Sequence, residues 1–220
     1  MHSLTSRVFR RPLTGLCAAA AAAALMSALA GCDVRPGAAS AASSAAQTSF
    51  HSTDITGAPY AKGFSLKDPA GQTRTLQDFR GQVVVVFFGF TQCPDICPTA
   101  LAEIQAVKEA LGPQGAKVRP VFISLDPERD TPDVLKAYVA QFGADVVALR
   151  PSLEELPALA KSFKIFYRKV EGKTPGSYTL DHTAGSYVFD AEGRIRLFAK
   201  HGGGAEALSQ DIAQLLPSSR

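Results

Sequence analysis

The chain has 220 residues, of which 46% are hydrophobic and 20% charged, so it is neither disordered nor fibrous and can form one globular domain plus a short additional segment. The formal net charge of +3 depends on Arg7, Arg10 and Arg11, because removing these three from the 23 basic residues leaves 20, equal to the 20 acidic residues. A neutral chain without a concentrated basic run has little attraction for a phosphate backbone, which argues against nucleic-acid binding.

The first 31 residues are typical of an export signal. The three arginines precede an uncharged stretch, 13–30, that contains an unbroken run of alanines at 18–24. It ends in Leu29-Ala30-Gly31-Cys32, which resembles the bacterial lipobox, in which the cysteine receives a lipid and becomes the mature N-terminus. We therefore expect residues 1–31 to be a lipoprotein signal peptide and Cys32 to be lipidated. The alternative is an uncleaved anchor, because an uncharged stretch of this length could just span a bilayer.

Either alternative exports the protein and attaches it to a membrane. Asp33, directly after Cys32, resembles the signal that retains enteric lipoproteins on the inner membrane, so we expect the periplasmic face of the bacterial inner membrane. Residues 32–53 are rich in Ala, Ser and Gly without apolar periodicity, which predicts a flexible, lipid-anchored tether. The folded domain is expected over 54–220.

The first strong structural signal in the domain is the Val-Val-Val-Val-Phe-Phe run at 83–88, which predicts a central strand buried on both faces. After it, the pattern alternates between helices and strands. The expected elements are a turn at 89–98, a helix at 99–111, a strand at 118–125, a helix from Thr131 to about 142 and a strand at 146–149.

The last part of the chain predicts a helix, a hairpin and a closing helix. Ser152 and Glu155 form a capping box that opens a helix, although Pro157 conflicts with its continuation. Strands at 186–189 and 195–198 are joined by a turn, and a helix follows over 204–216. This order predicts an α/β fold: a thioredoxin-like mixed sheet flanked by helices, with an added antiparallel hairpin.

Only two cysteines remain for chemistry in the folded domain. Cys17 lies in the signal and Cys32 takes the lipid, which leaves Cys93 and Cys97 in the turn before the first helix. A helix N-terminus lowers thiol pKa values and favours the nucleophilic or metal-binding thiolate. A purely structural disulfide would close only a short loop and stabilise little. Three residues separate the cysteines, one more than in a thioredoxin motif, so both sulfurs could bind one metal ion.

Three sequence blocks occur in order and together resemble the SCO/SenC family over about 57–216. They are F-x-x-T-x-C-P-D-I-C-P at 88–98, S-L-D-P-E-R-D-T-P at 124–132, and Y-T-L-D-H-T at 178–183 followed by Tyr187-Val188-Phe189. The resemblance implies a thioredoxin-like fold, membrane attachment, and copper bound by two cysteines and a distant histidine for assembly of the copper centre of cytochrome c oxidase. Carried over by position, the ligands are Cys93, Cys97 and His182.

The chemistry of these residue types agrees with that implication. Two soft thiolates and one imidazole suit three-coordinate Cu(I) and also accept Cu(II), whereas a closed zinc site needs a fourth protein ligand. His51, in the tether, and His201, before a glycine run, are expected to be solvated. Asp181 either accepts a hydrogen bond that orients His182 or caps a turn. Residues 126–130 are expected to shape the loop before the second helix, without a chemical role.

The leading hypothesis is therefore a copper metallochaperone, not an enzyme, that passes copper to an acceptor such as a cytochrome c oxidase subunit. Other periplasmic copper carriers or thiol reductases are further expected partners. The alternative is a thiol-disulfide reductase that keeps the acceptor's cysteines reduced, with Cys93 attacking and Cys97 resolving, or the reverse. A peroxiredoxin is disfavoured because Pro94 occupies the position of that family's threonine. A role in sensing copper or redox state is equally compatible with these residues.

Overall fold

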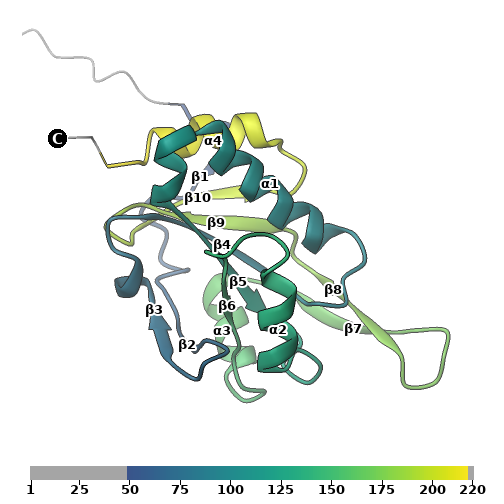
Figure 1. Cartoon of the computed structure of the whole chain (residues 1–220). Helices are drawn as coiled ribbons and strands as arrows, with labels where there is room; N and C mark the ends of the chain where they lie inside the picture. The colour runs from purple at the N-terminus through teal and green to yellow at the C-terminus, as the bar shows by residue number, and fades with distance from the viewer. Residues whose placement is uncertain (1–48, 218–220) are drawn as a thin grey trace, which may run out of the picture. The chain divides into compact units, whose positions relative to one another are not determined.

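A six-stranded mixed sheet forms the centre of the computed structural model, which describes residues 49–217 (Figure 1). The strand order is β1-β10-β9-β4-β5-β6. These strands are β1 (Thr53–Asp54), β4 (Val83–Gly89), β5 (Val118–Ser124), β6 (Val147–Leu149), β9 (Gly185–Phe189) and β10 (Ile195–Lys200). Strands β4, β5 and β6 are parallel, whereas β9 and β10 run antiparallel to their neighbours. The predicted mixed sheet is confirmed.

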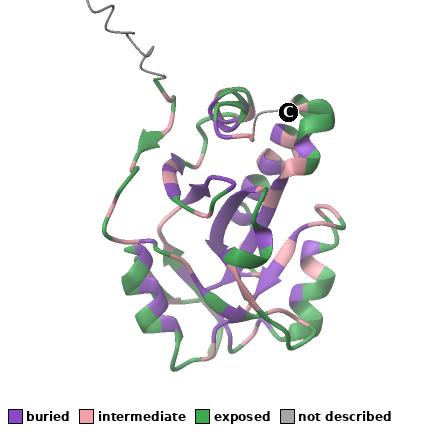
Figure 2. Cartoon of the chain, turned by 90° about the vertical axis from the view of Figure 1, so that its left-hand side faces the viewer, coloured by how far each residue is buried: buried purple, intermediate pink, exposed green. Residues whose placement is uncertain are grey.

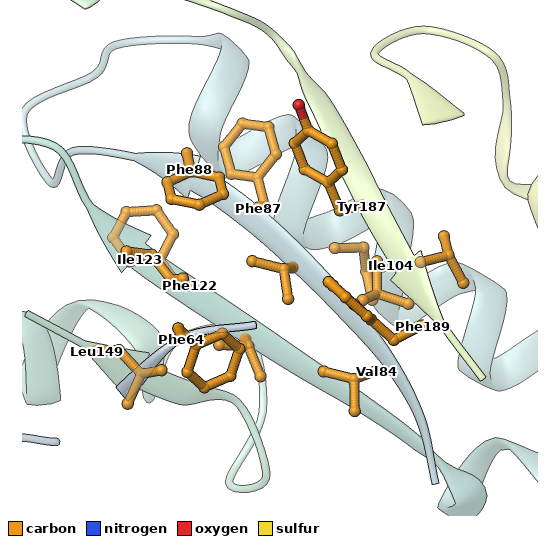
Figure 3. Packing of buried hydrophobic residues seen from close by; sticks show 14 of the residues in the cluster. Phe64, Val84, Phe87, Phe88, Ile104, Phe122, Ile123, Leu149, Tyr187 and Phe189 are labelled. Atoms are coloured by element: carbon orange, nitrogen blue, oxygen red, sulfur yellow. The ribbon is translucent and has the colours of Figure 1, made fainter. Parts of the chain in front are cut away.

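Strand β4 is the core of the domain, and all of its residues are buried (Figure 2). Its side chains alternate between the two faces of the sheet. Phe88 packs on Phe163, with ring centroids 5.0 Å apart. Phe87 packs on Phe122 of the neighbouring strand (Figure 3). A strand that is covered on both faces needs a continuous apolar sequence, which is why the Val-Val-Val-Val-Phe-Phe run predicted it correctly.

Helices cover both faces of the sheet. They are α1 (Ile96–Ala110), α2 (Pro132–Val139), α3 (Leu156–Phe163) and α4 (Ala205–Ala213), with short 3-10 helices at η1 (Leu76–Phe79) and η2 (Gly112–Lys117). Helices α1 and α4 lie side by side (Figure 1), and α3 contributes Phe163 to the Phe88 face. Within residues 49–217, no helix has the length and apolar character needed to cross a membrane.

Two helix starts differ from the prediction because of proline. Helix α1 begins at Ile96 rather than at residue 99, and Pro98 lies in its first turn. Backbone N–H groups in a first turn have no carbonyl partner within the helix, so the missing N–H of proline costs no hydrogen bond there. Cys97 is therefore part of the helix. Pro157 likewise lies in the first turn of α3, so the expected conflict does not arise. The predicted capping box is present: Ser152 N–H donates to Glu155 Oε2, and Glu155 N–H donates to Ser152 Oγ.

Two small antiparallel sheets were not predicted. One pairs β2 (Ser65–Lys67) with β3 (Thr73–Thr75), and the other pairs β7 (Tyr167–Glu171) with β8 (Tyr178–His182). The β7–β8 hairpin extends away from the main sheet in Figure 1 and shares no ladder of hydrogen bonds with it. Because most side chains of the hairpin are exposed, its sequence has no apolar run from which a strand could be predicted.

The last part of the predicted tether is attached to the domain. Phe50 packs against the hydrophobic core, and the buried carboxylate of Asp211 accepts the backbone N–H groups of His51 and Ser52 at 2.7 and 2.8 Å. These contacts fix the chain before Asp54, where we expected the domain to begin. The predicted signal peptide, Cys32 and the rest of the tether lie outside the described residues.

Candidate metal centre

The register of the central strands brings distant parts of the chain to one edge of the sheet. Strands β4 and β9 are antiparallel, and Phe87 lies opposite Ser186. The end of β4, which continues into the cysteine loop, is therefore beside the start of β9, which follows His182 closely in the chain. This pairing explains how His182 reaches the cysteines although 85 residues separate it from Cys97.

The three residues expected as ligands lie together. The sulfurs of Cys93 and Cys97 and a ring nitrogen of His182 are all within 4.8 Å of one another. The Sγ of Cys97 is 3.8 Å from His182 Nε2, and both cysteines are free thiols. In the described part of the chain this is the one group of three or more His, Cys, Asp or Glu side chains so arranged. Neither His51 nor His201 belongs to it.

The ring of His182 is held in one orientation. Its Nδ1–H donates to the backbone carbonyl of Thr183 at 2.9 Å, which leaves the lone pair on Nε2 directed toward the sulfurs. The ring also packs edge-on against Phe87 and Phe90, with centroid distances of 6.2 and 5.9 Å. The imidazole is thereby presented as a metal ligand before any metal binds.

Asp181 does not orient His182. Its carboxylate accepts a hydrogen bond from Arg168 at 2.8 Å on the exposed side of the hairpin. Successive side chains of a strand point to opposite faces, so Asp181 and its neighbour His182 face apart. The orienting role that we considered for Asp181 belongs to the carbonyl of Thr183, a backbone group that the sequence does not reveal.

The two cysteines differ in exposure and charge. Cys93 is half-buried, whereas Cys97 is buried in the first turn of α1, and its backbone N–H donates to Cys93 Sγ at 3.3 Å. The hydrogen bond from the Cys97 thiol, together with the one from the Cys97 backbone N–H, lowers the pKa of Cys93 to about 4. The same hydrogen bond and burial raise the pKa of Cys97. The pair therefore carries one negative charge, located on the more exposed sulfur.

A glycine makes room for the buried sulfur. At Gly89, the last residue of β4, an added Cβ would lie 2.7 Å from Cys97 Sγ and 2.9 Å from the ring of Phe122. Such distances are too short for non-bonded atoms, so any larger residue here would displace the sulfur or the ring.

The site opens to solvent through a pocket. A pocket of about 400 Å³ is lined by Cys93 and His182 together with the exposed apolar side chains of Ile96 and Phe166. Cys97 is buried behind these groups. An incoming ion thus meets Cys93 and His182 first, and a soft cation that displaces the Cys97 proton gains two sulfur ligands and one nitrogen ligand.

The loop at 126–130 supports the site, which the sequence analysis did not anticipate. The fully buried carboxylate of Asp130 accepts hydrogen bonds from the Thr91 N–H and hydroxyl and from the Ser124 hydroxyl, which anchors the cysteine loop. Burial raises the pKa of Asp130. Arg129 donates to the side chain of Gln92 and to the backbone of β8. The loop therefore does more than shape the start of α2, because it contacts both ligand-bearing segments.

Comparisons with known proteins agree with this geometry. The SCO1/SenC family profile matches residues 52–217. An SCO2-like protein of Rickettsia felis is 37% identical over 139 residues, which are 63% of this chain and 66% of that protein. The mitochondrial SCO2 homolog of Bos taurus is 33% identical over 159 residues, 71% of this chain and 60% of that protein. The chain thus spans about two thirds of the length of the first relative and less of the second.

Solved structures give the same result. Bradyrhizobium japonicum ScoI with copper bound is 37% identical, with a TM-score of 0.63 over 70% of this chain and 98% of that chain. The apo Sco1 protein from Thermus thermophilus is 36% identical, with a TM-score of 0.67 over 78% of this chain and 99% of that chain. The thioredoxin-like arrangement predicted from the sequence is therefore confirmed.

Alkylation tests the charge distribution. Iodoacetamide reacts with thiolates, so at neutral pH it should modify Cys93 and spare Cys97. Because the pKa of Cys93 is about 4, its thiolate persists above that pH, and the rate should fall only as the pH drops through about 4. Replacing Cys97→Ala removes the main hydrogen-bond donor and should slow alkylation at neutral pH by raising the pKa of Cys93. Peptide mass spectrometry follows both sites; preferential modification of Cys97 would refute the assignment.

Proposed function

The chain belongs to the SCO1/SenC family, and from this membership and the geometry of its cysteine–histidine site we propose that it is a copper metallochaperone. In this proposal Cys93, Cys97 and His182 bind one copper ion outside the cytoplasm and pass it to an acceptor protein. The observation that carries the proposal is the convergence of two free thiols and one oriented imidazole beside an open pocket that Cys93 and His182 line. Copper-bound structures of the similar ScoI proteins of Bradyrhizobium japonicum and Arabidopsis thaliana support it.

The donor set favours copper over zinc. A closed zinc site needs four protein ligands, whereas two thiolates and one imidazole satisfy three-coordinate Cu(I) and also accept Cu(II). Copper here is cargo rather than a resident cofactor. A site that is open on one side allows an acceptor's own ligands to replace Cys93 and His182 first and Cys97 last. The acceptor we propose is a cytochrome c oxidase subunit, with other periplasmic copper carriers or thiol reductases as further partners.

A competitive Cu(I) titration of the full chain tests this site. The reduced wild-type protein should bind one equivalent tightly, and oxidation to the Cys93–Cys97 disulfide should abolish binding because it removes both thiolates. His182→Ala should weaken Cu(I) binding by about 100-fold, because losing a ligand should cost at least as much affinity as losing a residue that only orients a ligand. The control, His201→Ala, should leave the affinity unchanged. Absence of tight binding by the reduced wild type would exclude the metallochaperone.

A second function, thiol-disulfide reduction, is favoured by one observation: the half-exposed cysteine is the one with the lowered pKa. The thiolate of Cys93 would attack a partner disulfide and release one partner thiolate. Cys97, after losing its proton, would attack the Cys93 sulfur and release the second partner thiol. Two electrons pass to the partner, a Cys93–Cys97 disulfide forms, and an external dithiol must reduce it again. This order is supported by the open pocket, because of the two cysteines only Cys93 lines it.

Trapping distinguishes the two cysteines. With glutathione disulfide, Cys97→Ser should accumulate a mixed disulfide at Cys93, because no thiol remains to resolve it. Cys93→Ser should react at least about 10-fold more slowly, since its remaining thiol is buried and protonated. Intact-mass measurements over time report both adducts. Faster adduct formation by Cys93→Ser would reverse the assignment, and equal rates would remove the asymmetry on which the reductase depends.

We also propose that the protein is exported and held at the periplasmic face of the inner membrane by a lipid on Cys32. The support is the sequence Leu29-Ala30-Gly31-Cys32 after an uncharged segment, with Asp33 as the retention residue. Attachment at a membrane would place the copper site close to a membrane-bound acceptor.

Substitution of the lipidated residue tests the attachment. Cys32→Ser should abolish incorporation of labelled palmitate and move the protein from the membrane fraction to the soluble fraction or leave the signal unprocessed. Cys17→Ser, within the predicted signal, is the matched control and should change neither. Unaltered labelling and membrane retention of Cys32→Ser would disprove lipidation at this residue.

A further inference from the structure

The third ligand is carried by a segment that the main sheet does not hold. His182 is the last residue of β8, and the β7–β8 hairpin shares no ladder of hydrogen bonds with the six-stranded sheet. The pairing of β4 with β9 brings His182 near the cysteine loop, but the hairpin that carries it must be held against that loop by contacts outside the sheet ladder. The inference below concerns those contacts and rests on the proposed copper site.

Arg129 connects the cysteine loop with the hairpin. Its Nη1 donates to Gln92 Oε1 at 3.0 Å, next to Cys93, and to the backbone carbonyl of Tyr178 at 2.8 Å, at the start of β8. The guanidinium also lies over the ring of Tyr178 at 3.6 Å and near the ring of Phe90 at 5.9 Å. Phe90 in turn packs against His182. One side chain therefore contacts both segments that bear ligands.

Arg129 is itself fixed by a buried carboxylate. Its Nε donates to Asp126 Oδ2, and the other oxygen of Asp126 accepts the hydroxyl hydrogen of Tyr178 at 2.8 Å. The side chain of Asp126 is only 2% exposed, and a buried negative charge is costly unless a positive charge such as that of Arg129 lies beside it. Arg129, Asp126 and Tyr178 thus form a closed triangle, defined here as the Arg129 latch, that ties the turn end of the hairpin, where Tyr178 pairs with Glu171, to the loop at 126–130.

No other ion pair of the described hairpin residues replaces this latch. Arg168 pairs with Asp181 and Lys169 pairs with Glu128, but all four side chains are between 44% and 64% exposed. Exposed ion pairs stabilise little, because water screens the attraction and ordering the side chains costs entropy. The buried contacts of Arg129 are the stronger restraint.

We propose that Arg129 is a positioning residue for the third copper ligand. It holds the β7–β8 hairpin against the cysteine loop and thereby keeps His182 Nε2 within reach of an ion bound by the two sulfurs. Arg129 does not touch the ion. Without it, copper still binds to the cysteines, but the hairpin must be ordered at the moment of binding, which weakens the contribution of His182.

A double-mutant cycle on the full chain, titrated with Cu(I) alone, tests this role. Arg129→Gln should lower the affinity about 10-fold in the wild-type background, the lower end of the effect of losing a group that orients a ligand. In the His182→Ala background the same substitution should have less than about a two-fold effect, because the ligand on which it acts is absent. Arg129→Lys should restore only part of the affinity, since the ammonium group of lysine cannot reproduce both the hydrogen bonds of the planar guanidinium and its stacking on the ring of Tyr178. Arg168→Gln is the matched control on the exposed side and should change neither background.

The possible failures can be told apart. An equal loss in both backgrounds, or no loss in either, would overturn the role of Arg129 and leave the copper site standing. Unchanged affinity in His182→Ala alone would instead remove the histidine from the site and with it this proposal. If Arg129→Gln unfolds, as circular dichroism would show, Tyr178→Leu takes its place, because it removes the stacked ring but keeps the Arg129–Asp126 pair. Nitrogen hyperfine structure in the electron paramagnetic resonance spectrum of the Cu(II)-loaded protein should weaken in Arg129→Gln and Tyr178→Leu and persist in Arg168→Gln.

Discussion

The antiparallel pairing of β4 with β9 determines where the proposed metal ligands meet. Phe87 and Ser186 are opposite one another, so the cysteine loop leaves the sheet at the same edge at which the chain enters it after His182. A shift of this register by one residue would turn every side chain of β4 to the other face and separate the ligands. Burial of β4 on both faces opposes such a shift, because Phe87 and Phe88 each fill a packed aromatic cluster (Figure 3). The hydrophobic core and the metal site are thus products of the same strand pairing.

The two sulfurs share one charge, and this asymmetry allows one site to serve two chemistries. Cys93 is a half-exposed thiolate in the loop before α1, and Cys97, in the first turn of α1, is its buried, protonated partner. A soft cation draws both sulfurs and the imidazole together, whereas an oxidant joins the same sulfurs in a disulfide. Copper binding and disulfide formation exclude each other, so the redox state of the pair would control whether copper is carried.

Sequence patterns identified the parts of the fold that depend on apolar runs and helix periodicity, and the three motif blocks identified the cysteines and His182. They failed where long-range polar contacts decide the structure. The β7–β8 hairpin has mostly exposed side chains and therefore no apolar signal. The partner of His182 is a backbone carbonyl, and Arg129 meets Tyr178 across 49 residues of sequence. The predicted helix began at residue 99 instead of Ile96, because the sequence alone does not show that Pro98 lies in a first turn rather than before the helix.

X-ray absorption at the copper edge of the Cu(I)-loaded chain tests the central claim most directly, because it counts the atoms bound to the metal. The account predicts two sulfur scatterers and one nitrogen scatterer per copper in the wild-type protein, with the nitrogen lost in His182→Ala and both sulfurs retained. A shell of sulfur alone in the wild type, or a nitrogen that survives in His182→Ala, would contradict the assignment of Cys93, Cys97 and His182 as the copper site.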